Sequence, residues 1–120
     1  MRDWETMWQF QTAHFRIEWA ITDEDSPDFS FDETGETAEK VYSGEWKCFT
    51  SRVRVIEKQT GVELGFDYLG NSIYANPAEF RDHVGARGRW GSYFRDMVHS
   101  ACSEARKTLK ARKPIYIRGT

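Results

Sequence analysis

Residues 92–110 read SYFRDMVHSACSEARKTLK, and this stretch decides the fold because its apolar side chains recur at the spacing of an α-helix. One face of that helix would be apolar and consist of Phe94, Met97, Val98, Ala101, Ala105 and Leu109. The other face would carry Arg95, His99, Ser103, Arg106 and Lys110. We therefore expect a long amphipathic helix that begins at Ser92. Pro114 is expected to end it, and residues 115–117 then either add a short edge strand or trail off.

Upstream of this helix, the clearest strand signal is an alternation with a period of two. Phe15, Ile17, Trp19 and Ile21 alternate with His14, Arg16, Glu18 and Ala20. This pattern predicts a strand with one buried face. It reaches back towards Phe10 but loses its phase across Thr12 and Ala13, where we expect a kink or a bulge.

Two further strands are predicted as a hairpin. Residues 48–56 are rich in Val, Phe and Thr, and residues 58–61 supply turn-forming side chains. The second strand resumes over residues 62–69, with Val62, Leu64, Phe66 and Tyr68 in phase.

Two short helices have recognisable start signals. Thr37 can cap a helix over residues 38–43, which Gly44 would end. Asn76 can cap a second helix, because Pro77 follows at the first helical position and Glu79 lies three residues after the cap. This second helix is expected to end near Val84.

These elements predict an α+β fold in a single domain spanning residues 1–120. An antiparallel sheet of three to four strands and a long C-terminal amphipathic helix bury both apolar faces when the helix packs on one face of the sheet. Charged residues make up 30% of the chain, and the mean hydropathy of −0.71 argues against a membrane span. No apolar leader marks the N-terminus and only two cysteines are present, so we expect a cytoplasmic location.

The charges are sorted along the chain. Residues 1–46 carry twelve Asp and Glu against three Lys and Arg, whereas residues 47–120 carry seven against fourteen. The acidic half includes a dense set that could occupy a basic groove on a partner protein: Asp23, Glu24, Asp25, Asp28, Asp32, Glu33 and Glu36. A solvated acidic loop that only keeps the protein in solution explains this set slightly better when it is taken by itself. A calcium loop is disfavoured, because the EF-hand Gly and terminal Glu are missing.

Two basic features point to anions instead. Arg87 and Arg89 precede Ser92 at a helix start, where backbone N–H groups suit a phosphate or carboxylate, although a flexible connection with solvated arginines is the favoured interpretation. A larger set, with Trp90 or Tyr116 as stacking groups, could follow a nucleic-acid backbone: Arg106, Lys107, Lys110, Arg112, Lys113 and Arg118. A net charge of −2 and a pI near 5.9 disfavour a dedicated nucleic-acid binder.

Catalytic and metal-binding patterns are weak. A small enzyme would use Cys48 or Cys102 as a nucleophile with a histidine, namely His14, His83 or His99. His99 and Cys102 lie three residues apart on the long helix, but Cys102 borders its apolar stripe and structural cysteines are the favoured interpretation. The chain has no Cys-x-x-Cys pair, so we expect no zinc site, no other metal and no cofactor.

Several segments resemble those of small uncharacterised proteins from phages, plasmids and bacterial mobile islands. They are FDETGE at 31–36, DYLG at 67–70, SIY at 72–74, PAEF at 77–80, GSYF at 91–94, DMV at 96–98 and EAR at 104–106. The resemblance covers residues 10 to 110 and carries over no catalytic or binding residue. It implies a context in which compact proteins bind a host protein, as inhibitors of CRISPR and other defence systems do.

The sequence thus favours a non-enzymatic protein that binds a host protein or a nucleoprotein complex. The favoured function is inhibition of a host defence complex of the CRISPR type, through an acidic surface that also bears aromatic rings. The alternatives are a nucleic-acid-binding accessory protein that uses the basic C-terminal half and a small Cys/His enzyme. We expect no membrane partner and either a monomer or a homodimer.

Overall fold

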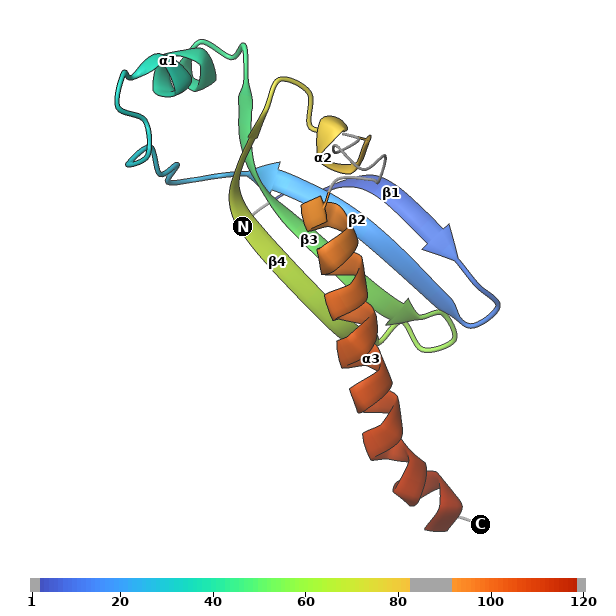
Figure 1. Ribbon diagram of the computed structural model, residues 1–120. Helices are drawn as coiled ribbons and strands as arrows, with labels where there is room; N and C mark the ends of the chain where they lie inside the picture. The colour runs from blue at the N-terminus through green and yellow to red at the C-terminus, as the bar shows by residue number, and fades with distance from the viewer. Residues whose placement is uncertain (1–2, 83–91, 119–120) are drawn as a thin grey trace.

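The computed structural model describes residues 3–82 and 92–118, with side chains described for 3–81 and 93–112. Four strands form an antiparallel sheet in chain order: β1 (Glu5–Gln11), β2 (Phe15–Asp23), β3 (Lys47–Glu57) and β4 (Glu63–Tyr74). Helix α1 (Glu36–Tyr42) lies between β2 and β3, and α2 (Glu79–Asp82) precedes the long helix α3 (Ser92–Arg118) (Figure 1). The expected α+β architecture is confirmed.

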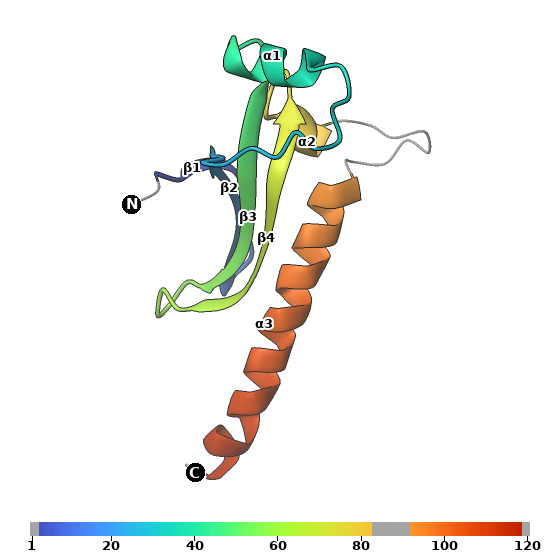
Figure 2. The same cartoon turned by 90° about the vertical axis from the view of Figure 1, so that its left-hand side faces the viewer.

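Helix α3 lies along one face of the sheet, as the edge-on view in Figure 2 shows. The predicted apolar stripe faces the sheet, because Phe94, Met97, Ala101 and Ala105 are all buried. At the centre of the core, Trp19 is 1% exposed and its Nε1 donates a hydrogen bond of 3.0 Å to Ser51 Oγ. We call the opposite side of the sheet the open face.

A glycine allows α3 to approach β4 closely. A Cβ atom at Gly65 would overlap the carbonyl oxygen of Ala101 and would lie 2.6 Å from the backbone nitrogen of Ala105. Thr108 adds a hydrogen bond across the same contact, donating from its hydroxyl to the Leu64 carbonyl at 2.9 Å. The helix therefore packs on β4 through backbone atoms.

The region before β2 is a separate strand, which corrects the expectation of one strand with a kink. The chain reverses after β1, and Thr12 N donates to the Phe15 carbonyl at 2.9 Å. The Thr12 hydroxyl in turn accepts from Phe15 N at 3.1 Å. A small polar residue that bonds the backbone on both sides favours a turn over a continuous strand. The bulge lies earlier, between Thr6 and Trp8 of β1.

Strand β4 extends beyond the predicted end at Leu69 to Tyr74, because a bulge keeps it paired. The register with β3 shifts between Phe49 and Ser51, and Asn71 adopts the left-handed conformation with φ 54°. The carboxylate of Glu24 holds this bulge by accepting hydrogen bonds from Thr50 Oγ1 at 2.7 Å and from Asn71 N at 3.2 Å.

The start of α1 also differs from the prediction. The helix begins at Glu36 after Gly35, which has φ 79°, so Thr37 lies inside the helix and is not its cap. One backbone N–H group in the first turn of the helix finds its hydrogen-bond acceptor in Asp32, whose Oδ2 accepts from Ala38 N at 3.1 Å. The predicted end is confirmed, because Gly44 follows the helix with φ 86°.

The other two helices follow the sequence signals in part. Asn76 Oδ1 accepts from Ala78 N at 3.1 Å, as a capping residue should, although α2 is assigned only from Glu79. The predicted end near Val84 lies outside the described residues. Helix α3 continues past Pro114 to Arg118, so Pro114 does not end it and residues 115–117 form no strand. Proline has a helix-compatible φ and removes one N–H donor, so a helix can continue past it with one bond missing.

The molecule is elongated, with extents of 64 × 37 × 22 Å. Helix α1 lies at one end, and the C-terminal part of α3 extends past the sheet at the other end (Figures 1 and 2). The exposed acidic residues around α1 and the exposed basic residues of α3 therefore lie towards opposite ends, while the strands of the acidic and basic halves share one sheet. None of the described helices combines the length and the apolar character that crossing a membrane would require.

Candidate functional site

An acidic hollow opens where β1 begins and β2 ends. It has a volume of about 550 Å³ and is lined by Asp3, Trp4, Glu5, Ile21, Thr22, Asp23 and Asp25. Antiparallel pairing of Glu5 with Ile21 brings the two segments together, so four carboxylates from distant parts of the sequence surround one opening. Two residues of the predicted acidic set, Asp23 and Asp25, therefore line this cavity.

Glu24, Asp28 and Asp32, three of the predicted partner-binding residues, make hydrogen bonds within the described part of the chain that support the fold. Glu24 holds the β4 bulge and Asp32 caps α1. Asp28 Oδ1 accepts from Ser30 N at 2.9 Å, and hydrogen bonds from the backbone and side chain of Ser30 lower the pKa of this carboxyl group. Asp28 N also donates to Asn71 Oδ1 at 2.9 Å, which ties the acidic loop to the bulge.

The other four acidic residues are exposed and fall into two groups. Asp23 and Asp25 line the acidic hollow, whereas Glu33 and Glu36 lie at the start of α1. Asp3 and Glu5 were not predicted as site residues, because the sequence pattern did not indicate that β1 is a strand antiparallel to β2. A search for carboxylates at paired strand ends would have found them.

The basic side chains of α3 lie away from the acidic hollow. Arg112 pairs with Glu57 of β3, with 3.1 Å between Arg112 Nη1 and Glu57 Oε2. The pKa of Glu57 is lowered, first by the Thr60 hydroxyl bond and then by Arg112. Arg106, Lys107 and Lys110 are exposed on the helix. The described ion pair of α3 therefore joins Arg112 to Glu57 of β3, and not to a carboxylate of the acidic segment between β2 and α1.

Several predicted basic and histidine residues cannot be placed. Arg87, Arg89, His83 and Trp90 lie outside the described residues. Ser92 begins α3, and Lys113, Tyr116 and Arg118 lie within it, but their side chains are outside the described part.

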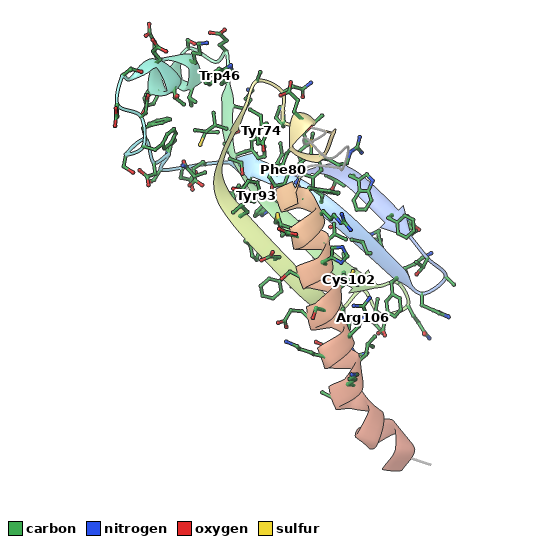
Figure 3. The ribbon with its side chains drawn as sticks, in the orientation of Figure 1. Trp46, Tyr74, Phe80, Tyr93, Cys102 and Arg106 are labelled. Atoms are coloured by element: carbon green, nitrogen blue, oxygen red, sulfur yellow. The ribbon has the colours of Figure 1, made fainter. Side chains whose placement is uncertain are left out.

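The cysteines lie in apolar or protected surroundings. Figure 3 shows Cys102 and Arg106 on α3, and Cys102 lines a cavity of about 180 Å³ with Phe15, Ile17 and other side chains of the sheet and helix. Burial raises the pKa of the Cys102 thiol, and Arg106 offsets this only partly. Burial and then Glu24 raise the pKa of the Cys48 thiol. These thiols are therefore poorly suited to form a nucleophilic thiolate at neutral pH.

The raised thiol pKa gives a direct prediction for Cys102. In a Cys48→Ser variant, iodoacetamide should label the native protein at pH 7.5 about tenfold more slowly than the unfolded protein, because thiolate is the reactive form. The labelling rate should keep rising above pH 9, followed by mass spectrometry. Fast labelling of native protein at pH 7 would restore Cys102 as a nucleophile candidate. The histidine alternative has little support, since His99 is exposed while Cys102 faces the sheet.

The described residues contain no group of three or more His, Cys, Asp or Glu side chains that could hold a metal ion. A scan against protein-family models gives no match, and searches of curated proteins and of solved structures find no similar protein. The geometry of the acidic hollow is consequently the basis on which a function can be argued.

Proposed function

We propose that this protein acts by binding a partner and not by catalysis, and that the acidic hollow receives a basic segment of that partner. The observation that supports this most directly is the convergence of Asp3, Glu5, Asp23 and Asp25 around one cavity. A volume of about 550 Å³ leaves room for side chains of a partner, and the lining is more polar than that of a typical small-molecule pocket. Lys and Arg side chains of a partner fit both the size and the charge.

The separation of charge in space favours the same function. We call the end of the molecule that carries α1 and the acidic hollow the acidic end, and its carboxylates are mostly exposed. The basic part of α3 lies at the opposite end (Figure 1). A dipolar molecule of this kind is drawn acidic end first towards a basic surface, which raises the association rate. Trp4 adds an aromatic wall to the acidic hollow, and the protein's own Arg52 guanidinium lies 4.3 Å from the centroid of that ring.

For the partner, we propose a host complex that handles nucleic acid and presents a basic groove, such as a defence complex of the CRISPR type. This choice rests on the resemblance to small proteins of phages, plasmids and mobile islands. The acidic end would then occupy a surface that otherwise binds phosphates.

Reversing two charges at the acidic hollow tests the proposed binding. The variant with Asp23→Lys and Asp25→Lys should bind a fluorescein-labelled nona-arginine peptide about tenfold more weakly than the native protein at 50 mM salt. The reason is that a partner cation would meet ammonium groups in place of carboxylates. Fluorescence anisotropy at 50 and 150 mM salt gives the affinity and its salt dependence, which should also become shallower.

The matched control carries the same charge change elsewhere at the acidic end, namely Glu33→Lys with Glu36→Lys. It should retain affinity within about threefold, because these exposed carboxylates lie outside the acidic hollow. An equal loss in both double variants would mean that net charge, and not the acidic hollow, attracts the peptide.

A further inference from the structure

The open face of the sheet carries three arginines around one buried glutamate. Glu18 of β2 has a side chain that is only 5% exposed, and it contacts Arg54, Arg16 at 3.3 Å and Arg52 at 4.0 Å. Strand pairing places Arg54 directly opposite Glu18, and Arg52 opposite Ala20. The cluster is built into the two central strands, so the pleat of the sheet fixes its position.

Among the described residues, Glu18 contacts the three guanidinium groups and the charge of Glu63 also acts on Arg52, so three cations against two carboxylates leave this cluster positive. Arg16 and Arg54 keep 34% and 31% of their side chains exposed, so their outer N–H donors reach solvent. Arg52 is 14% exposed, and its Nε is buried without a hydrogen-bond partner. The pairing with Glu18 therefore holds the arginines in place and leaves donors over for an anion.

Aromatic rings lie on the same face, beside the arginines. Phe66 and Tyr68 of β4 pair with Arg54 and Arg52, respectively, and each is 50% exposed. Their ring centroids are 5.4 Å apart, and the Trp4 ring lies 6.1 Å from Tyr68 with the Arg52 guanidinium 4.3 Å from its centroid. Two exposed rings thus adjoin a row of cations.

We propose that the open face binds single-stranded nucleic acid, with phosphates on Arg16 and Arg54 and bases on Phe66 and Tyr68. Basic side chains that follow the backbone, together with rings on which bases stack, are the general means of binding single strands. This site borders the acidic hollow at Trp4, but Arg16, Arg54, Phe66 and Tyr68 do not line the hollow, and the proposal does not depend on the function proposed for it.

The geometry favours a single strand over a duplex. The Phe66 and Tyr68 ring centroids are 5.4 Å apart and their planes are inclined by 65°, whereas stacked nucleotides follow one another about every 3.4 Å. Bases on Phe66 and Tyr68 must therefore be unstacked from each other, as a single strand allows. The open face also presents no helix or ribbon to enter a groove. An acidic protein segment would satisfy the arginines but would leave the paired rings without a flat partner.

The test uses the full chain and a fluorescein-labelled oligonucleotide of fifteen thymidines, with fluorescence anisotropy at 50 and 200 mM salt. The native protein should bind at 50 mM salt and weaken as salt rises. The variant with Phe66→Ala and Tyr68→Ala should bind at least about fivefold more weakly, since each stacking ring contributes to affinity. Arg16→Gln should reduce the slope of log affinity against log salt by about 0.7, the value for one phosphate contact on a single strand.

Matched controls remove equivalent groups outside the open face. Tyr42→Ala with Tyr93→Ala removes two rings that are 77% and 60% exposed, and Lys107→Gln removes one exposed cation of α3. Both should bind like the native protein, and thermal melts should show that every variant is folded. The proposal fails if the oligonucleotide does not bind at 50 mM salt or if the controls weaken it equally. It also fails if a duplex of the same length binds as tightly, or if a polyglutamate peptide competes as well as the oligonucleotide.

Discussion

Replacing Trp19 by alanine should lower the free energy of unfolding by about 4 kcal/mol, the typical cost of removing a buried tryptophan side chain. Trp19 of β2 is 1% exposed, and its ring contacts side chains of both α2 and α3. Its ring centroid lies 5.6 Å from that of Phe80 in α2 and 5.4 Å from that of Phe94 in α3. The truncation would leave a cavity between the sheet and both helices, and Ser51 Oγ would lose its donor.

Chemical denaturation followed by circular dichroism measures this loss, and the melting temperature should fall by about 15 °C. Trp46→Ala is the matched control, because Trp46 is only partly buried and its described contact is with Lys40, whose Nζ lies 4.4 Å from the ring centroid. That variant should lose about 1 kcal/mol. Similar losses for the two variants would show that Trp19 is not the centre of the core.

Gly65→Ala should destabilise the protein by about 3 kcal/mol, although it adds a single methyl group. The added Cβ would meet the Ala101 carbonyl oxygen and the Ala105 nitrogen, which are backbone atoms of α3 and cannot rotate away. The helix must shift from β4 to make room, which loosens the packing of Ala101 and Ala105. Denaturant unfolding gives the loss, and increased binding of a hydrophobic dye would report the shift of the helix.

Gly70→Ala on the same strand is the control for Gly65. A Cβ there would lie 3.1 Å from Glu24 Oε2 and 3.6 Å from Thr50 Oγ1, which are side-chain atoms and not backbone, so a shift of a few tenths of an ångström in the Glu24 carboxylate relieves the contact. We expect a loss below about 1 kcal/mol. A greater loss from Gly70→Ala than from Gly65→Ala would refute the close approach of α3 to β4 as the cause.

The sequence predicted best those elements in which apolar residues recur regularly within one continuous segment. The stripe from Phe94 to Ala105 repeats over several turns, so both the helix and its buried face followed from spacing alone. The hairpin of β3 and β4 was equally clear, because turn residues separate two β-rich runs. Caps were less predictable, since Asp32 reaches Ala38 from six residues away.

Strand phase alone did not show which side of the sheet would be covered. Phe66 and Tyr68 have the composition of a core strand, yet they lie on the open face and are half exposed. The core side of β4 instead carries Leu64, which is buried, and Gly65, where backbone atoms of α3 leave no room for a Cβ. A period of two identifies two faces of a strand, but the packing of a distant helix decides which face is buried.

By itself, the sequence determined that an antiparallel sheet would pair with a C-terminal helix, and that negative and positive charges would occupy different halves of the chain. The tertiary structure decided where those charges would meet. It placed Asp3 and Glu5 beside Asp23 and Asp25, and it gathered Arg16, Arg52 and Arg54 around Glu18. The physical reason is strand register: residues far apart in the chain become neighbours only when hydrogen-bonded strands fix their alignment, and spacing along one segment carries no record of that alignment.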